Sequence, residues 1–163
     1  MTQMTDQLIT TVEHQYQQDQ QKKMLSQNVE DVNPAKEDWR IKVKVVRAWK
    51  VPNFQLKDFD DNVEMVLLDE QGGRIHATVK GSLQVRKKIH ERECYSIKKK
   101  IGVGFNSDVF RPTKHQYRLS FNLRTDVKSI VDSNISASEF DFVDYDIIEK
   151  ETYDSSYLVL FIF

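Results

Sequence analysis

The chain has 163 residues, with 24 Lys/Arg against 25 Asp/Glu and a formal net charge of −1. These charges are segregated, because residues 39–128 hold 20 Lys/Arg against 10 Asp/Glu whereas both flanks are acidic, which predicts a polyanion partner for the middle region. The length fits one domain with tails, and no stretch approaches the roughly 20 apolar residues of a transmembrane helix.

The first element in chain order is a polar arm, followed by a strand. Residues 1–38 carry eight glutamines among the first 28 positions, and they are predicted to be disordered or a marginal helix. After Trp39, Ile41 and the apolar residues that follow alternate with Arg and Lys, which is typical of a half-buried strand. At Val45 and Val46 the alternation slips by one residue. This predicts a β-bulge and a long bent strand that serves two sheets.

Two strands joined by a tight turn are predicted next. After a long loop at 50–62, apolar residues alternate at 63–67 and again at 75–79. Gly72 and Gly73 lie between these runs and permit a hairpin turn. The opposite face of the second strand is polar and basic, and it carries Arg74, His76, Thr78 and Lys80.

The remainder of the middle region predicts a short helix and two further strands. Residues 82–91 have the pattern of a short helix that crosses a barrel end. Residues 95–103 alternate as a strand, and Lys99 on the apolar phase marks a second bulge or the barrel rim. After an irregular loop at 104–116, residues 117–123 form a fifth strand.

The order strand, strand, strand, helix, strand, strand predicts the fold class. It is all-β with minor α: a five-stranded OB-fold Greek-key barrel with a short helix between strands 3 and 4, and with flexible N- and C-terminal arms. Small SH3-like or ribosomal barrels are the alternative. The predicted domains are a polar Gln-rich arm at 1–38, an OB-fold nucleic-acid-binding domain at 39–128, and an acidic connector with an apolar tail at 129–163.

Three segments of the middle region carry a resemblance to a known family. They are WRIKVKVVRAWKVP at 39–52, MVLLDEQGGRIHATV at 65–79 and YRLSF at 117–121. In this order they resemble a DNA-binding domain of the large subunit of replication protein A, in its expanded plant form. The resemblance implies a nuclear protein that binds single-stranded DNA in DNA replication, repair or recombination. RNA is the alternative ligand, and other replication protein A subunits are implied partners.

The resemblance implies roles for individual residues, with two departures. His76 stands where the family has a basic residue before the Ala-Thr pair, which makes that charge titratable. Lys80 stands near the position of a base-stacking aromatic, which predicts a weaker and more salt-sensitive binder. Phe110 matches the second stacking aromatic of the family, and Lys114 matches the basic residue shortly after it.

The predicted DNA-binding residues are cations of the strand faces and loops, together with one aromatic. They are Lys42, Lys44, Arg47, Lys50, Arg74, His76, Lys80, Lys98, Lys100, Phe110, Arg111, Lys114 and Arg118. The alternative interpretation of the cations is an ordinary solvated sheet surface. Phe54 and Phe110 are either stacking residues or loop anchors that pack on the barrel. Trp49 is expected to be structural, with a position in the binding groove as the alternative.

Catalysis, cofactors and metal binding are not predicted. The sequence has no Ser/His/Asp or Cys/His arrangement and no Gly-rich loop that would cradle a phosphate. Cys94 and the four scattered histidines lack the paired spacing of a zinc site, and Cys94 is expected to be a buried thiol in a reducing compartment. From these features we expect a non-enzymatic protein of the nucleus or cytosol, with no membrane association and no small-molecule substrate; the resemblance implies the nucleus.

Other functions stay open at this point. The barrel is alternatively a protein-interaction module or a truncated paralogue that does not bind DNA, and the absence of the strand-three aromatic motivates this alternative. A further hypothesis is autoinhibition, in which the acidic residues 129–163 fold over the cationic barrel as a DNA mimic.

Overall fold

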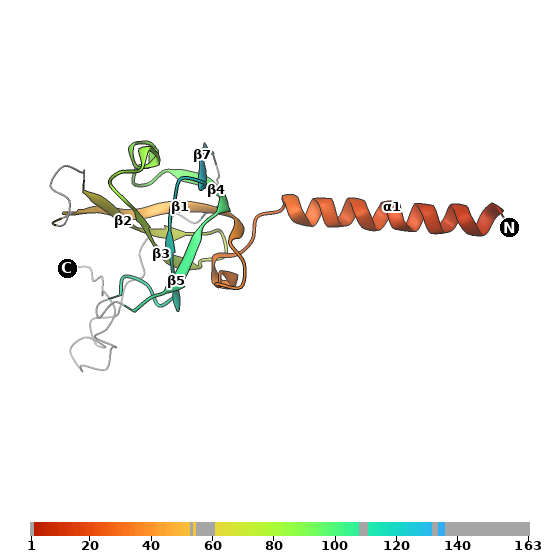
Figure 1. Cartoon of the computed structure of the whole chain (residues 1–163), viewed down its shortest axis with the longest axis horizontal. Helices are drawn as coiled ribbons and strands as arrows, with labels where there is room; N and C mark the ends of the chain where they lie inside the picture. Colours follow the sequence, from red (N-terminus) through yellow and green to blue (C-terminus); the bar gives the residue numbers. More distant parts are fainter. Residues whose placement is uncertain (1, 53, 55–60, 108–110, 132–133, 136–163) are drawn as a thin grey trace.

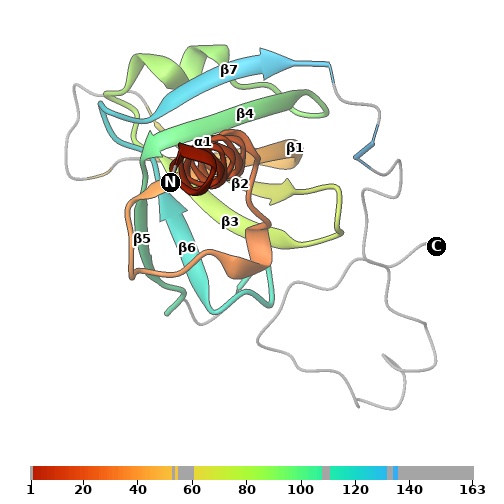
Figure 2. The same cartoon turned by 90° about the vertical axis from the view of Figure 1, so that its right-hand side faces the viewer.

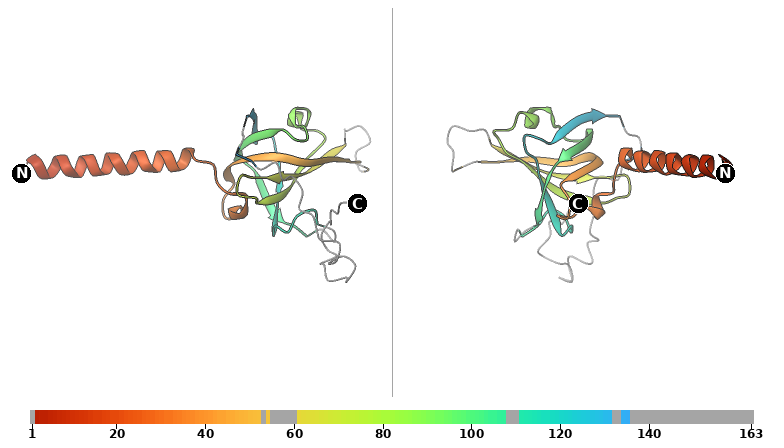
Figure 3. Two further views of the ribbon diagram at one scale, coloured as in Figure 1. Left: turned by 180° about the vertical axis from the view of Figure 1, so that it is seen from behind. Right: turned by 45° about the vertical axis from the view of Figure 1, so that its right-hand side comes forward.

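The computed structural model describes residues 2–52, 54, 61–107, 111–131 and 134–135, and the structural statements below refer to this part of the chain. It contains one curled, mostly antiparallel sheet and a long N-terminal helix that extends away from it (Figures 1 and 3). The elements in chain order are α1 (Thr2–Met24), η1 (Val29–Asp31), β1 (Asp38–Val51), β2 (Asn62–Leu68), β3 (Arg74–Val79), η2 (Gln84–Lys88), β4 (Cys94–Lys100), β5 (Gly102–Phe105), β6 (Tyr117–Ser120) and β7 (Asp126–Ile130).

Strand β1 takes part in both halves of the sheet. Its first half pairs with β4, its second half pairs with β2, and Lys44 pairs with both neighbours. The register with β2 shifts between Val45 and Arg47, which confirms the bulge predicted at Val46. Because a bulge increases the local bend and twist of a strand, it allows β1 to turn from one half of the sheet into the other.

The sheet has the strand order β5-β6-β3-β2-β1-β4-β7, and β3 and β6 are its parallel pair. Strands β4 and β5 lie near opposite ends of this order, yet Ile101 alone separates them in the chain. The curled sheet therefore closes on itself through the covalent run from β4 to β5, which lies at one side of the barrel in Figure 2. This arrangement confirms the predicted OB-fold barrel.

The predicted fourth strand is interrupted where Lys99 falls on the apolar phase. Lys99 has φ 72°, a left-handed conformation, and it pairs with Trp39 at the end of β4. The irregularity predicted there is confirmed. It divides the predicted strand into β4, which pairs with β1, and β5, which pairs with β6.

The main core lies inside the barrel and is built from the alternating apolar residues of the strands. Each fully buried aliphatic side chain contributes about 1.5–3 kcal/mol of stability. The buried members of this core are Val29, Val32, Trp39, Ile41, Val43, Val45, Met65, Leu67, Ile75, Ala77, Val79, Tyr95, Ile97, Ile101, Leu119 and Phe121.

The segment before β1 is attached to the barrel by hydrogen bonds to buried groups. The Val29 N–H donates to Asp69 Oδ2 at 2.7 Å, and His115 Nε2 donates to the Val29 carbonyl at 2.9 Å. Asp69 also accepts hydrogen bonds within the β2–β3 turn, where Gly72 has φ 85°. The packed unit therefore reaches into residues 29–32, which the sequence analysis assigned to the N-terminal arm.

Several elements differ from the sequence-based expectation. Residues 2–24 form helix α1, so of the two states predicted for the arm, disorder or a marginal helix, the structure has the helix. Strand β7, which pairs with β4, was not predicted. The helix predicted at 82–91 is the shorter 3₁₀ helix η2. Strand β6 ends at Ser120 because Asn122 and Thr125 form a hydrogen-bonded turn, which leaves Leu123 90% exposed.

Candidate nucleic-acid interface

Strands β1, β2, β3 and β6 present polar side chains on the side of the sheet opposite the main core. We call this surface the outer face and define it by Arg47, Trp49, Glu64, Arg74, His76, Thr78 and Arg118. Strand register places Trp49 beside Glu64, Glu64 beside Thr78, and His76 beside Arg118. Adjacent strands lie about 4.8 Å apart, so these side chains are within contact range of one another.

A hydrogen-bonded network centred on Glu64 occupies the middle of the outer face. Glu64 Oε2 accepts hydrogen bonds from His76 Nε2, from Thr78 Oγ1 at 2.8 Å and from Arg118 Nη2 at 3.4 Å. Arg118 Nη2 also lies 2.5 Å from Thr78 Oγ1. The side chains are 5% exposed for His76, 14% for Glu64 and 23% for Arg118, so the network holds the guanidinium in place while part of it stays accessible.

The network keeps Glu64 ionised at neutral pH. Burial raises the pKa of Glu64, but hydrogen bonds from His76 and Thr78 and electrostatic attraction to His76 and Arg118 outweigh this effect. The pKa of Glu64 therefore lies below its ordinary value of 4.5. The sequence analysis missed this residue; the hairpin register is centred on Gln71 and places Glu64 opposite Thr78, whereas a turn centred on Gly72 would have placed it opposite Lys80.

Trp49 supplies an aromatic ring at one side of the network. Its ring stacks on that of His76, with centroids 6.0 Å apart and an interplanar angle of 19°. The residue is 36% exposed, so part of the indole is accessible to a ligand. Of the two positions considered for Trp49, the structure places it on the outer face rather than in the core. It lies on β1, whereas the sequence analysis looked for a stacking aromatic near Lys80, after β3.

The predicted cations are distributed over two surfaces instead of one. Arg47, Arg74, His76 and Arg118 belong to the outer face, and Lys44 lies at its border. Lys42, Lys98 and Lys100 lie on the part of the sheet formed by β4, β7 and the first half of β1. This division follows from the bend in β1, which turns its two halves toward different directions.

The lysines of β4 are engaged by carboxylates of the same domain. Lys98 Nζ lies 3.7 Å from Asp126, and Lys100 Nζ lies 3.3 Å from Glu37 and 3.8 Å from Asp38. Such exposed ion pairs contribute about 0–1 kcal/mol each and exchange readily with other anions. They lower the net positive charge of this second surface.

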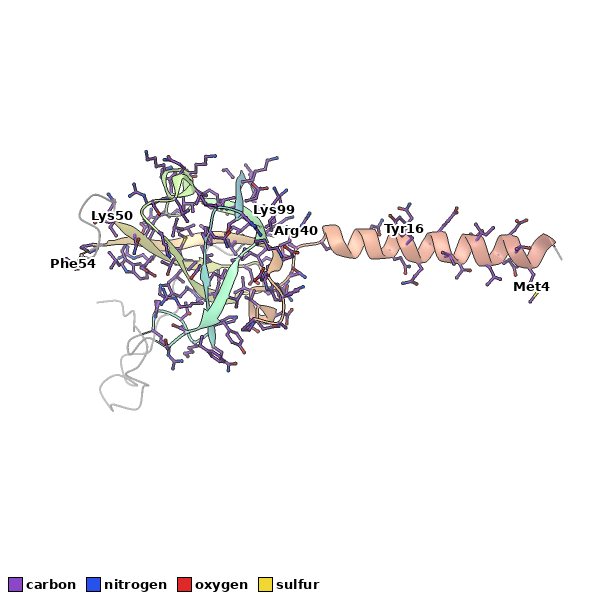
Figure 4. All side chains as sticks on the ribbon, viewed as in Figure 1. Met4, Tyr16, Arg40, Lys50, Phe54 and Lys99 are labelled. Atoms are coloured by element: carbon purple, nitrogen blue, oxygen red, sulfur yellow. The ribbon has the colours of Figure 1, made fainter. Side chains whose placement is uncertain are left out.

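Several other cationic and aromatic side chains lie around the barrel ends. Lys50 and the 86% exposed Phe54 lie at the end farthest from α1, whereas Arg40 and Lys99 lie beside it (Figure 4). Lys80 and Lys114 are exposed, Arg111 is half-buried, and Phe110 lies outside the described residues.

A further exposed aromatic, not assigned from the sequence, is Phe105 at the end of β5. Its ring is 66% exposed and contacts that of Tyr117 at a centroid distance of 5.3 Å. Tyr117 and Arg118 are neighbours in β6, so their side chains point to opposite sides of the strand, and this ring pair lies on the side of Leu119, not on the outer face. An apolar residue following Gly104 within an otherwise irregular stretch was the only available signal in the sequence.

The outer face also carries an apolar strip. Val46, Val66 and Leu68 form a second buried cluster on this side of the sheet. Ile135 packs on this cluster, and only 6% of its own surface is exposed. Cys94 is half-buried against the same cluster. The expected buried thiol is thus partly accessible.

Within the described ranges, no group of three or more His, Cys, Asp or Glu side chains could hold a metal ion. No helix found there combines the length and the apolar composition needed to cross a bilayer.

Comparison with solved structures supports the OB-fold through one match with a TM-score above 0.5. A chain of a replication protein A heterotrimer bound to ssDNA is similar at 21% identity and a TM-score of 0.61, and the match covers 76% of this chain. This chain spans 29% of the length of that one, so the likeness shows the OB-fold alone. The hypothetical protein F20O9.120 from Arabidopsis thaliana matches 69% of this chain and 77% of its own at 17% identity, with a TM-score of 0.48.

None of the curated proteins matches the sequence. The family described as "Domain of unknown function DUF223" matches residues 30–151, which include every strand of the barrel. The chain therefore belongs to the DUF223 family.

Proposed function

We propose that the outer face binds single-stranded DNA, and that the protein is a non-enzymatic binding module in DNA replication, repair or recombination. The observation that carries this proposal is the partly exposed Trp49 ring stacked on His76, at one side of the Glu64 network that holds the Arg118 guanidinium on its other side. An aromatic platform next to a positioned guanidinium suits a ligand with alternating bases and phosphates.

The two parts of the face would contribute differently to binding. Base stacking on an aromatic contributes about 1–3 kcal/mol per base and is largely independent of salt. Phosphate contacts release counterions, so they weaken as salt rises. We assign stacking to Trp49, and phosphate contacts to Arg47, Arg74 and Arg118.

The remaining predicted residues are proposed to act around this centre. Lys50, at the end of β1, and Lys80, Phe110, Arg111 and Lys114, outside the long strands, would contact the nucleic acid at the barrel ends. Lys42, Lys44, Lys98 and Lys100 would act mainly by attracting the ligand at long range, because they lie away from the centre of the outer face and because carboxylates engage Lys98 and Lys100.

The likeness to the replication protein A chain supports this reading at the level of the fold, and that protein's structure contains ssDNA. On this basis we propose a nuclear location and assembly with other replication protein A subunits. RNA is the alternative ligand, since stacking on an aromatic does not distinguish the two nucleic acids.

Titration of a fluorescent oligo-dT with the full chain tests the proposal at about 50 and 200 mM salt. We expect binding that weakens clearly at the higher salt concentration. Trp49→Ala should weaken it about 5- to 10-fold at both salt concentrations, since one ring face already contacts His76 and the effect falls at the low end of the stacking range. Leu123→Ala, at an exposed apolar residue of the β6–β7 turn, is the control and should change nothing. Absence of binding at low salt would rule out the proposal.

A protein-interaction module is the second candidate, and helix α1 is the observation that favours it. Met4, Leu8, Val12 and Tyr16 recur every four residues on α1, and each is more than half exposed. Most of the stability of helices in proteins comes from packing of an apolar face, so a partner that covers this stripe would stabilise α1. If Leu8→Asp abolishes capture of a protein partner in the presence of nuclease, and oligo-dT does not bind, this candidate replaces the first.

A further inference from the structure

The apolar strip of the outer face is covered by a residue from the far end of the chain. Val46, Val66 and Leu68 point away from the main core, and Ile135 packs on them until only 6% of its surface is exposed. Ile135 follows β7, which lies on the other half of the sheet beside β4. The chain therefore leaves β7 and returns to the outer face.

Cations surround the place where Ile135 packs. In the strand register, Lys44 and Arg74 flank Leu68, while Arg47 and His76 flank Val66. Strand neighbours lie about 4.8 Å apart. A chain segment that continues from Ile135 therefore starts among positively charged side chains.

The sequence after Ile135 is strongly acidic. Residues 136–154 contain seven Asp/Glu and a single Lys. The acidic residues are Glu139, Asp141, Asp144, Asp146, Glu149, Glu151 and Asp154. A segment of this length, about 3.3 Å per residue when extended, is long enough to cross the roughly 20 Å width of the strands that form the outer face.

Attachment at Ile135 makes this contact intramolecular. Covalent linkage of a binding segment close to its site gives an effective concentration in the millimolar range, so even weak ion pairs become populated. Charge complementarity and the point of attachment both favour the chain's own acidic segment over a separate partner.

We propose that residues 136–154 bind the cations of the outer face, with Ile135 as the anchor, and compete with single-stranded nucleic acid for them. The competition rests on the proposed function. The contact between the acidic segment and the outer face is independent of that function, because it can be measured without any nucleic acid.

The contact is tested by comparing backbone amide NMR spectra of three full-length proteins. The tail variant is D141N/D144N/D146N, and the matched control is D6N/E13Q/D19N on α1, which changes the net charge by the same +3. We expect the amides of Arg47, Arg74 and His76 to shift in the tail variant and not in the control. Raising the salt concentration should shift the wild-type amides in the same direction, because it screens the ion pairs. Identical spectra at these positions would overturn the contact.

The competition is tested by oligo-dT titration of the same three proteins at low salt. We expect the tail variant to bind about tenfold more tightly than wild type, a coupling within the usual range, and the control to bind like wild type. Equal affinity of all three proteins would overturn the competition. If no protein binds oligo-dT, the proposed function fails, whereas the NMR comparison still decides whether the tail contacts the face.

The anchor is tested with Ile135→Ala in the full chain. Loss of apolar contact with Val46, Val66 and Leu68 should release the acidic segment and produce the same direction of amide shifts at Arg74 and His76. Lys128 on β7 serves as the reference position and should not shift. Unchanged amides at Arg74 and His76 would show that Ile135 does not hold the segment there.

Discussion

Replacing Glu64 with Gln is expected to lower stability and strengthen nucleic-acid binding at the same time. The substitution keeps the size of the side chain and removes its negative charge from the centre of the outer face. His76, Thr78 and Arg118 lose a charged acceptor, while the ligand no longer meets a carboxylate.

The stability loss follows from the three hydrogen bonds. Hydrogen bonds to charged groups contribute about 1.5–3 kcal/mol each and neutral ones about 0.5–1.5 kcal/mol. Since the amide retains one acceptor oxygen, we expect E64Q to lose about 1–3 kcal/mol of unfolding free energy at pH 7. The binding effect has the opposite sign, because Arg118 and His76 become available to phosphates. The slope of the logarithm of the binding constant against the logarithm of the salt concentration should steepen by about the value of one phosphate contact.

The stability difference should depend on pH in a defined direction. The pKa of Glu64 is lower in the folded protein than its ordinary value of 4.5, so the unfolded state binds more protons. The contribution is therefore complete above about pH 4.5 and is lost as the pH falls through the lower pKa of the folded state. E64Q lacks this ionisation, so its deficit relative to wild type should shrink in acid.

Urea unfolding at pH 7, 5, 4 and 3, combined with oligo-dT titration at two salt concentrations, measures both effects. Equal stability of E64Q and wild type at pH 7 would refute the reasoning about the network. Weaker binding by E64Q would show instead that the carboxylate itself contacts the bases, as Glu does when it accepts a hydrogen bond from cytosine.

Two further substitutions test the framework that holds the face, both by urea unfolding. Asp69→Ala should cost at least about 2 kcal/mol, because it leaves the buried Val29 N–H without its acceptor and removes two bonds from the β2–β3 turn; a loss below 0.5 kcal/mol would contradict this role. Lys99→Gly should stabilise the protein by up to about 1 kcal/mol by relieving its φ of 72°, whereas Lys98→Gly, the control at a residue without positive φ, should destabilise it.

The sequence predicted the parts of the fold that depend on local alternation. Period-2 patterns identified the inward residues of β2 and β3, and the shift of the pattern at Val45 and Val46 located the bulge. This works because a strand buried on one face has apolar side chains at every second position. The strand end at Ser120 was not predictable in this way. It depends on reciprocal hydrogen bonds between Asn122 and Thr125, which polarity patterns do not distinguish from a continuing strand.

The candidate site was only partly predictable, because its arrangement depends on contacts across strands. Alternation showed that Arg74 and His76 point outward, but the hydrogen bonds to Glu64 require the register of two strand pairs. The sequence also grouped Lys98 with these residues. It contained no information on how far the bend in β1 turns one half of the sheet away from the other.

The pairing of β1 with β4 has a consequence for how the chain folds. The β2–β3 hairpin brings together residues that are close in the sequence, whereas β1 must find β4 across the whole of that hairpin and η2. Such non-local pairing costs chain entropy before it gains contacts, so folding on a timescale of milliseconds to seconds is expected. The β2–β3 hairpin should acquire hydrogen-exchange protection first. The amides of the β1–β4 pairing should be the last in the barrel to become protected.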